Sequence, residues 1–394
     1  MSKKNIVIAG GGFAGLSALR RLSGFKKSSL TDFNLVLIDR KDAFEFLPML
    51  PDVTGGWLDP EGLRSDLKKA CNSQRCEFIK DEVTGIDIAR RKITFSNSSL
   101  DYEYLLISSG SETNFFSSSN ERPGVYKLDN VDDAIKIRKA LLKRVEEAPP
   151  VNIVIVGGGY TGIEIATNIN YLLGRRGANH RIFILERAND ILTMVPGWIR
   201  DEVRKELMKL NIEIISGDSL KEYDGETVFL ESGEKKEHAF CIWAAGVKTP
   251  SFVDKIEAEK ERTRIKVTEE LWMKNAQDKN VFVAGDASAF FDERAKNFLR
   301  MAVMFSIGQG KVAAANIGNT VLKKPLIKYR PIDLGYLIPM AHGKAPGVVM
   351  ARRIHGSLGY LMHYFMCIYR SETINKMRVV RDLLKKQYGK KGGV

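Results

Sequence analysis

The sequence predicts an α/β protein that contains two copies of a strand–turn–helix unit, followed by a helical C-terminal extension. Three observations predict this fold class. A short apolar run near the start ends in a G-x-G-x-x-G pattern, the same pattern recurs in the middle of the chain, and the last residues are basic and amphipathic.

The first copy begins at residues 5–9 (NIVIA), an apolar run rich in β-branched residues that is typical of a buried parallel strand. Gly10, Gly12 and Gly15 follow. Their spacing suits a tight turn, the approach of a pyrophosphate to the backbone, and close packing of the next helix on the strand. A second strand at residues 34–38 leads into Asp39, an acid placed to bind a ribose hydroxyl.

The second copy begins at residues 152–156 (NIVIV) and continues with Gly157, Gly159 and Gly162. Residues 181–185 form the next strand and lead into Glu186, which lies as far from Gly157 as Asp39 lies from Gly10. A duplication with a matched acid is far more specific than one glycine run. Glu186 would repel a 2′-phosphate and so favours NADH, whereas a guanidinium at Arg187 could accept that phosphate.

Three further strands end in small residues, as strands must when a bulky ligand lies across their ends. Residues 104–107 run into Ser108-Ser109-Gly110, residues 240–243 into Ala244-Ala245-Gly246, and residues 281–283 into Ala284-Gly285-Asp286. Between the strands, the patterns predict helices over 58–70, 131–145 and 302–321, and a loop over 43–51.

The chain has 394 residues and a net charge of +13, and residues 351–394 hold ten lysines and arginines against two acids. Four cysteines in a chain of this length predict no disulfide framework, a reducing setting and buried thiols. The five histidines are scattered, so no metal site is expected. No segment has the length and apolar character of a transmembrane helix or a secretory signal.

The glycine turns and the strands that end in small residues follow one another, over residues 1 to about 325, in an order that resembles the two-dinucleotide-binding-domain flavoproteins. Within that family the chain is most similar to the type II NADH dehydrogenases. The resemblance rests on the segments 46–50 (FLPML), 104–116 and 159–164 (GYTGIE) and on the tail. It implies two Rossmann-like domains arranged as in glutathione reductase. The implied FAD-binding domain is 1–115 and 266–330, the implied NADH-binding domain is 116–265, and a membrane-associating region follows over 331–394.

The resemblance also implies how the candidate residues are used. Glu164 would act in proton handling or nicotinamide placement, although its position near a helix N-terminus also suits an exposed acid that complements the helix dipole. The residues implied to bind FAD are Gly10, Gly12, Phe13, Ala14, Gly15, Asp39, Arg40, Pro48, Ser109, Gly110, Gly285 and Asp286. Those implied to bind NADH are Gly157, Gly159, Thr161, Gly162, Glu164, Glu186, Ala245 and Gly246.

One segment departs from the family pattern. The type II enzymes usually carry two glutamines at the start of the late helix, and the matching positions here are Met304 and Gly308, with Gln309 out of register. The expected quinone region is therefore Met304, Phe305 and Gly308. The departure keeps two alternatives open: a flavoprotein oxidoreductase for sulfide or another acceptor, and a flavoprotein redox sensor or binding protein.

The preferred interpretation is a FAD enzyme that passes a hydride from NADH to FAD and two electrons on to a membrane quinone, without pumping protons. The tail then predicts an interfacial helix on anionic lipid at the cytoplasmic face of the cell membrane. The alternative for the tail is a helix docked on the core with a solvated basic end. A homodimer is a further expected partner, and nucleic acid is not, because no nucleic-acid motif accompanies the charge.

Overall fold

The computed structural model describes residues 3–26, 30–96, 98–116, 122–147, 149–274, 276, 278–371 and 375–388. The chain divides into two compact units, each made of three segments. Unit 1 comprises Met1–Phe44, Ser65–Glu112 and Val247–Asp333, and unit 2 comprises Glu45–Arg64, Thr113–Gly246 and Leu334–Val394.

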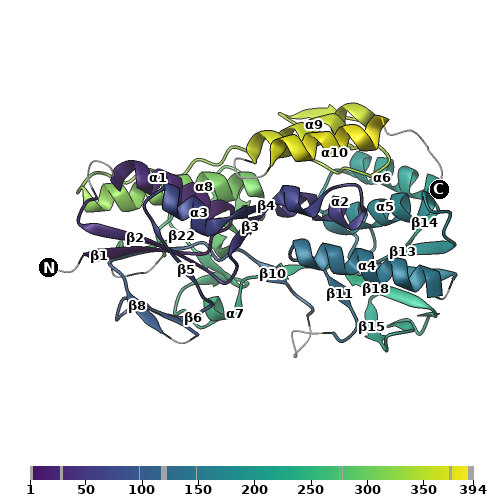
Figure 1. The fold of residues 1–394 in the computed structure, drawn as a ribbon, viewed down its shortest axis with the longest axis horizontal. Helices are drawn as coiled ribbons and strands as arrows, with labels where there is room; N and C mark the ends of the chain where they lie inside the picture. The colour runs from purple at the N-terminus through teal and green to yellow at the C-terminus, as the bar shows by residue number, and fades with distance from the viewer. Residues whose placement is uncertain are drawn as a thin grey trace. The chain divides into compact units, whose positions relative to one another are not determined.

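Unit 1 is built on a five-stranded parallel sheet in the order β22-β9-β1-β2-β5. These strands are β22 (Val281–Val283), β9 (Tyr104–Ile107), β1 (Lys4–Ala9), β2 (Phe33–Asp39) and β5 (Glu77–Lys80). Helices α1 (Phe13–Lys26) and α8 (Val303–Val321) lie side by side (Figure 1), so closely that a Cβ on Gly310 would stand 2.2 Å from the Ala14 carbonyl oxygen.

The rest of unit 1 consists of short elements around this sheet. The helical ones are α3 (Leu67–Ser73), α7 (Ser251–Asp254) and the 3₁₀ turn η3 (Gly285–Ala287). The strands are β6 (Val83–Asp87), β7 (Lys92–Phe95), β8 (Ser99–Asp101), β20 (Lys260–Glu261), β21 (Arg264–Lys266), β23 (Ser288–Ala289), β24 (Phe291–Asp292) and β25 (Asn297–Phe298).

Unit 2 repeats the plan. Its five-stranded parallel sheet has the order β11-β18-β12-β13-β14, with β12 beside β13 as β1 is beside β2. The strands are β11 (Tyr126–Lys127), β18 (Ala239–Trp243), β12 (Val151–Val156), β13 (His180–Glu186) and β14 (Ile212–Ser216). The two sheets confirm the predicted α/β class and the predicted duplication.

Helices and smaller sheets complete unit 2. The helices are α2 (Leu50–Thr54), α4 (Val131–Glu147), α5 (Tyr160–Gly174), α6 (Gly197–Lys209), α9 (Gly356–Arg370) and α10 (Lys376–Tyr388), with the 3₁₀ turns η1 (Leu47–Met49) and η2 (Pro60–Leu63). The strands are β15 (Leu220–Tyr223), β16 (Val228–Leu230), β17 (Lys235–Lys236), β26 (Gly335–Leu337), β27 (Gly347–Val349) and β28 (Arg352–Ile354). Four short strands lie at the unit boundaries: β3 (Ala43–Glu45), β4 (Arg64–Asp66), β10 (Glu112–Thr113) and β19 (Val247–Lys248).

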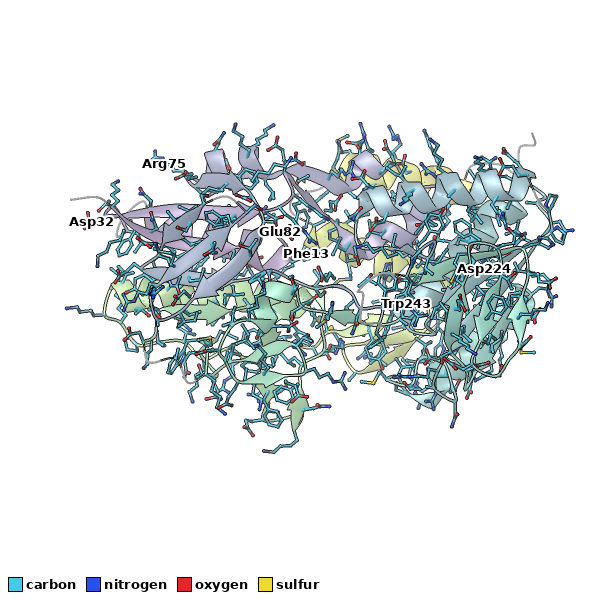
Figure 2. The ribbon with its side chains drawn as sticks, turned by 90° about the horizontal axis from the view of Figure 1, so that it is seen from below. Phe13, Asp32, Arg75, Glu82, Asp224 and Trp243 are labelled. Carbon is cyan, nitrogen blue, oxygen red and sulfur yellow. The ribbon has the colours of Figure 1, made fainter. Side chains whose placement is uncertain are left out.

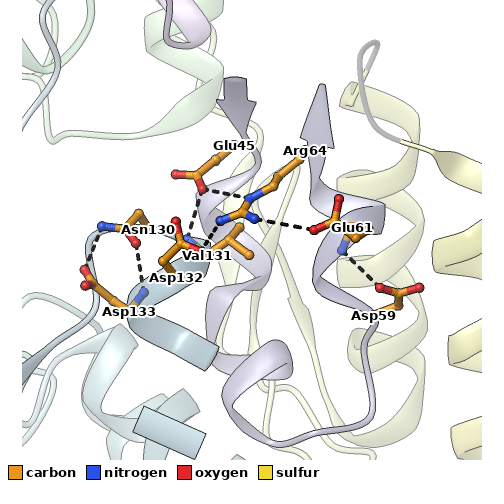
Figure 3. A network of polar contacts seen from close by, with 8 residues as sticks. All are labelled: Glu45, Asp59, Glu61, Arg64, Asn130, Val131, Asp132 and Asp133. Carbon is orange, nitrogen blue, oxygen red and sulfur yellow. Dashed lines mark hydrogen bonds and ion pairs between the residues drawn. The ribbon is translucent and has the colours of Figure 1, made fainter. Parts of the chain in front are cut away.

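A polar network holds the segment 45–64 in unit 2 (Figure 3). The Arg64 guanidinium contacts Glu45 at 3.2 Å and Asp132 at 2.6 Å. Glu45 also accepts a hydrogen bond from the backbone N–H of Val131, the first residue of α4, at 3.3 Å. The side chain of Glu45 is almost fully buried, so the partly buried Arg64 provides the charge that such a carboxylate requires.

The expected helix over 58–70 is wrong, because two aspartates divide that stretch. Asp59 accepts a hydrogen bond from the Glu61 N–H and starts the 3₁₀ turn η2, which ends at Leu63. After the strand β4, Asp66 caps a new helix by accepting from the Lys69 N–H at 2.7 Å. A capping residue has a non-helical backbone, so a helix cannot run continuously through it. The expected loop over 43–51 contains short regular elements, namely β3, η1 and the start of α2.

The C-terminal helices present two different faces. Tyr364, Val379 and Asp382 are buried in unit 2, whereas Leu361, Phe365 and Met377 are more than half exposed. The tail therefore docks on the core, as the alternative interpretation expected, and also leaves an apolar face uncovered within the described residues. The sequence also places Ile374 on the apolar face and Lys390 and Lys391 in the basic tail. These three residues lie outside the described residues.

Two further findings concern the whole chain. Among the residues with described positions, no helix is both long enough and apolar enough to cross a bilayer. The cysteines Cys71, Cys76, Cys241 and Cys367 are all buried, which confirms the expectation for the thiols.

Candidate functional site

The glycine turn after β1 has the geometry that its spacing predicts. Gly10 has φ +110°, and a Cβ there would stand 2.4 Å from the Ser108 carbonyl oxygen. A Cβ on Gly15 would stand 1.9 Å from the Gly10 carbonyl oxygen, so only glycine lets α1 pack this closely on the turn. Gly12 faces open space, which leaves the backbone at the start of α1 accessible to a phosphate.

The turn after β12 repeats each of these features. Gly157 has φ +114°, and a Cβ on Gly162 would stand 1.9 Å from the Gly157 carbonyl oxygen. Gly159 faces open space, as Gly12 does. The N-terminus of α5 is thus a second place at which backbone N–H groups can meet an anion.

The two acids bind their glycine turns in the same way. Asp39 accepts from the Gly11 N–H at 2.7 Å and from the Lys41 N–H at 2.8 Å. Glu186 accepts from Gly158 N–H at 2.7 Å and from Ala188 N–H at 2.8 Å. Each carboxylate therefore stays fixed at the end of its strand, with lone pairs left over for a ligand hydroxyl.

A cavity in unit 1 lies at the carboxyl ends of β1 and β2. It is lined by Gly10, Asp39, Arg40, Ser109 and Glu82, the last of which is labelled in Figure 2. The Ser109 hydroxyl is buried and has no hydrogen-bond partner among the described residues. A buried hydroxyl needs a partner, so this position suits the polar part of a ligand.

Side chains from three places in unit 1 that are far apart along the chain interact with the turn that contains Asp286. Ser111 donates to the Asp286 carboxylate at 2.8 Å, and Gln309 on α8 accepts from the Gly285 N–H at 2.8 Å. Burial raises the pKa of Asp286, while Ser111 and the charge of Arg264 act to lower it. The result is a nearly enclosed carboxylate at the end of β22.

Unit 2 holds a larger cavity, of about 450 Å³, at the carboxyl ends of β12, β13 and β18. Gly157, Gly159, Glu186, Ala245 and Gly246 line it together. The structure thus brings five of the predicted NADH-binding residues to one cavity of the size that small-ligand sites have.

Aromatic and charged side chains surround the same cavity. Its walls include Phe116, Arg122, Arg187, Asp218, Glu231 and Trp243, of which Trp243 is labelled in Figure 2. The Arg122 guanidinium lies 5.0 Å from the Trp243 ring centre, and Arg187 lies 6.0 Å from that of Phe116. Flat guanidinium–ring pairs are surfaces on which a base can stack.

Glu164 lies in the second turn of α5 and is only partly exposed. Burial raises the pKa of its carboxyl group well above the usual range, and the negative charge of Asp52 raises it further. A carboxyl group whose pKa burial raises does not suit the interpretation of a solvated acid at the helix N-terminus, because such an acid would keep a low pKa.

The other predicted residues occupy both units. Phe13 and Ala14 start α1, and the Phe13 ring packs edge-on to Phe44 at 5.0 Å. Pro48 belongs to unit 2, in η1. Among the residues expected near a quinone, Phe305 is buried in the first turn of α8, and Gly308 packs against Tyr329.

Sequence reasoning missed several residues that shape these sites. Nothing in the sequence links Ser111, Arg264 or Gln309 to Asp286, because all three are distant from it along the chain. Arg122 and Asp218 lie in loops and do not belong to the glycine pattern. Gln309 could have been identified as a buried polar position, since apolar and small residues surround it on α8.

Comparison with curated proteins finds relatives along nearly the whole chain. A type II NADH:quinone oxidoreductase of Staphylococcus saprophyticus is 22% identical over 378 residues, which cover 91% of this chain and 93% of the relative. The demethylphylloquinone reductase NdbB of Synechocystis is 24% identical, with 94% of this chain and 93% of the relative covered.

Solved structures show the same fold. NDH2 from Plasmodium falciparum in complex with NADH superimposes with a TM-score of 0.81 at 18% identity, covering 98% of both chains. The sulfide:quinone oxidoreductase of Aquifex aeolicus follows with a TM-score of 0.77 at 19% identity, covering 97% of this chain and 95% of that one. The family model for pyridine nucleotide-disulphide oxidoreductases matches residues 4–314. With both glycine turns inside the matched region, the chain belongs to the pyridine nucleotide-disulphide oxidoreductase family.

Proposed function

We propose that this chain is an NADH:quinone oxidoreductase that carries FAD, oxidises NADH and delivers two electrons to a membrane quinone without pumping protons. The observation that carries the proposal is the pair of equivalent glycine turns, each with its carboxylate bound to the turn. Two such turns in one chain suit two dinucleotides. The names of the relatives from Staphylococcus and Synechocystis support a quinone as the acceptor.

The residues of unit 1 fit FAD. The accessible backbone at Gly12 suits its pyrophosphate, Asp39 suits a ribose hydroxyl, and the unpartnered Ser109 hydroxyl and Asp286 suit further polar groups. Gly10, Phe13, Ala14, Gly15, Arg40, Gly110 and Gly285 complete the proposed set from unit 1. Pro48, which belongs to unit 2, is a further proposed FAD-binding residue. FAD, when bound, supplies a ring system that accepts a hydride and gives up two electrons. The proposed FAD-binding domain is 1–115 and 266–330.

The residues of unit 2 fit NADH. The start of α5 suits the pyrophosphate at Gly157, Gly159, Thr161 and Gly162, and Glu186 suits the adenosine ribose. Ala245 and Gly246 also line the cavity. The proposed NADH-binding domain is 116–265. We assign NADH over NADPH because the acids Glu186, Asp218 and Glu231 outnumber the two arginines, Arg122 and Arg187, that line this cavity.

Glu164 is the proposed catalytic residue. Burial raises the pKa of its carboxyl group, which favours a carboxyl group that can hold and release a proton, as the reduction of a quinone to a quinol requires. Met304, Phe305 and Gly308, at the start of α8, are the proposed quinone region.

The region 331–394 is the proposed membrane contact. Leu361 and Phe365 on α9 and Met377 and Leu384 on α10 are exposed, and basic residues of α10 lie beside them. Apolar side chains flanked by lysine and arginine suit an anionic lipid surface. We place the protein at the cytoplasmic face of the cell membrane as a peripheral protein, and a homodimer is part of the proposal.

The decisive experiment is a visible spectrum of the purified protein, recorded before and after NADH is added without oxygen. Bleaching of a flavin band by NADH, and its return on addition of a short-chain quinone, would support the proposal. A flavin band that NADH leaves unchanged would refute it. Sulfide in place of NADH tests the sulfide alternative directly.

Membrane contact is tested by flotation with phosphatidylglycerol vesicles. The double variant Leu361→Ser/Phe365→Ser should float less than the unaltered protein. The control Met194→Ser/Met208→Ser removes exposed apolar side chains from another part of unit 2 and should float normally. Equal flotation of all three proteins would contradict the proposed face.

A further inference from the structure

A cluster of buried polar side chains lies within unit 2, where α2, α5, α9 and α10 come together. Figure 1 shows α9 and α10, in yellow, along one side of α2 and α5. The cluster joins Asp52 of α2 to side chains of α5, α9 and α10.

Asp52 is the centre of this cluster. It is 4% exposed, and its Oδ1 atom accepts from the Tyr364 hydroxyl at 2.9 Å and from the Asn168 amide at 3.3 Å. Tyr364 and Asn168 are equally buried. Burial raises the pKa of Asp52 to about 6, although Lys386 and these two hydrogen bonds act in the opposite direction. Asp52 can therefore be either charged or neutral under ordinary conditions.

Lys386 supplies the positive charge from α10. Its ammonium group donates to the Tyr360 hydroxyl at 2.7 Å and lies 4.0 Å from the Trp57 ring centre and 5.0 Å from that of Tyr171. Burial lowers its pKa to about 8, and the charge of Asp52 acts to raise it. Aromatic rings stabilise the cation where water cannot reach it well.

Asn168 connects Asp52 to Glu164. The Asn168 amide donates to Asp52 at 3.3 Å and to the Glu164 carbonyl oxygen at 3.0 Å, one turn earlier on α5. The Trp57 indole N–H donates to the side-chain Oδ1 atom of Asn168 at 2.9 Å and fixes the amide. Asp52 is thus tied to the backbone of α5 at Glu164, and its negative charge acts to raise the pKa of the buried Glu164 carboxyl group. Charges interact strongly where water is largely excluded.

The ionisable groups around Asp52 come from every element packed on it. Helix α5 contributes Glu164 and Tyr171, α10 contributes Lys386, and α4 contributes Arg138, which donates to the Val53 carbonyl oxygen at 3.2 Å. Helix α9 contributes Tyr360, His363 and Tyr364, and the loop after β26 contributes His342 near Lys386. Burial holds His363 neutral, so its ring adds no charge near neutral pH.

We propose that Asp52 is a positioning residue that determines at which pH Glu164 releases its proton, and that Lys386 and Tyr364 of the C-terminal helices determine when Asp52 itself is charged. If Glu164 supplies a proton for quinone reduction, that supply depends on α9 and α10, and this consequence rests on the proposed function. The electrostatic link between the residues does not rest on it.

Infrared titration of the full-length protein tests the link directly. The carbonyl stretch of a protonated Glu164 is identified by its loss in Glu164→Gln, and that of Asp52 by its loss in Asp52→Asn. Asp52→Asn keeps the shape and the acceptor for Tyr364 but removes the charge. We expect the Glu164 band to disappear at a pH lower by about one unit, because a like charge close by raises the pKa of a carboxyl group.

Lys386 is tested in the same titration. Lys386→Met should keep Asp52 protonated to a pH higher by about one unit, because the anion loses its counter-charge. Lys386→Arg keeps the charge and should restore the original titration. The matched controls are Lys385→Met, an exposed neighbour, and Asp382→Asn, a buried carboxylate of α10 that accepts from the Asp59 N–H at 3.1 Å. Both should leave the two bands in place.

The outcomes test the electrostatic link between Asp52 and Glu164 (the network) separately from the proposed role of Glu164 in quinone reduction. An unmoved Glu164 band in Asp52→Asn overturns the network, whatever the turnover. If the band moves and the pH profile of NADH:quinone turnover moves with it, both the network and the role of Glu164 are supported. A moved band with an unmoved pH profile supports the network and refutes the proposed role of Glu164.

Discussion

The acid at the end of β13 offers a sharp test of the proposed NADH site. Glu186 binds two backbone N–H groups at the glycine turn and lines the cavity of unit 2. Glu186→Gln removes one negative charge and keeps the length of the side chain. We expect the variant to use NADPH better relative to NADH, because the 2′-phosphate of NADPH no longer meets that charge.

The size of the effect follows from Coulomb's law. At about 5 Å, with an effective dielectric constant of about 20, two unit charges of the same sign repel each other by about 3 kcal/mol. Glu186 lies at an open cavity, so screening by water lowers this to about 1–2 kcal/mol. That corresponds to a rise of about 5- to 30-fold in the NADPH:NADH ratio of kcat/KM. The amide also leaves one N–H without its charged acceptor, at a cost of about 1 kcal/mol in stability.

The assay is steady-state oxidation of each nucleotide with a saturating short-chain quinone. Glu213→Gln is the matched control, because Glu213 is an exposed acid of unit 2 that pairs with Arg181 on the neighbouring strand. Its nucleotide ratio should not change. If Glu186→Gln leaves the ratio unchanged while the protein stays folded, Glu186 does not select the nucleotide. The selection would then lie with Asp218, Glu231 or Arg187.

Three further predictions concern stability. Gly15→Ala forces a Cβ against the Gly10 carbonyl oxygen at 1.9 Å, so we expect a loss of about 1–3 kcal/mol in chemical denaturation and weaker flavin binding; unchanged values would contradict the packing argument. Gln309→Leu leaves the buried Gly285 N–H without an acceptor and should cost about 1–3 kcal/mol in the same denaturation experiment; an unchanged free energy of unfolding would contradict this. Burial lowers the pKa of His363 from 6.5 to about 4, so its contribution to stability is complete above pH 6.5 and is lost as the pH falls toward 4. His363→Phe should therefore gain about 1–3 kcal/mol relative to the unaltered protein as the pH falls through that range, and a constant difference in denaturation would refute this.

The sequence predicts well those parts of the fold in which a residue type is required by contacts within its own turn or strand. A glycine at Gly10 or Gly157 is required by a positive φ and by a backbone contact within the same turn. The acids Asp39 and Glu186 follow directly from the strands that carry them. These features can be found in one pass along the chain, and the structure confirms their geometry.

The parts that could not be predicted depend on contacts between distant segments. Asp52 and Lys386 look like ordinary polar residues in the sequence, and their charges matter only because folding buries them together. The expected helix over 58–70 was wrong because periodicity does not register a competing cap at Asp66. The sequence shows that Met304 and Gly308 replace the two glutamines of the type II enzymes. How this replacement affects the binding of a quinone is part of the proposed function.

The order of segments in unit 2 has a consequence for the synthesis of this protein. Its third segment, Leu334–Val394, is translated after the other two and carries Tyr364, Val379 and Asp382 into the interior of the unit. Until the ribosome has released these residues, the partners of Asp52 on α9 and α10 are missing and the unit exposes apolar surface. The interior of unit 2 therefore cannot be completed before its third segment has been synthesised.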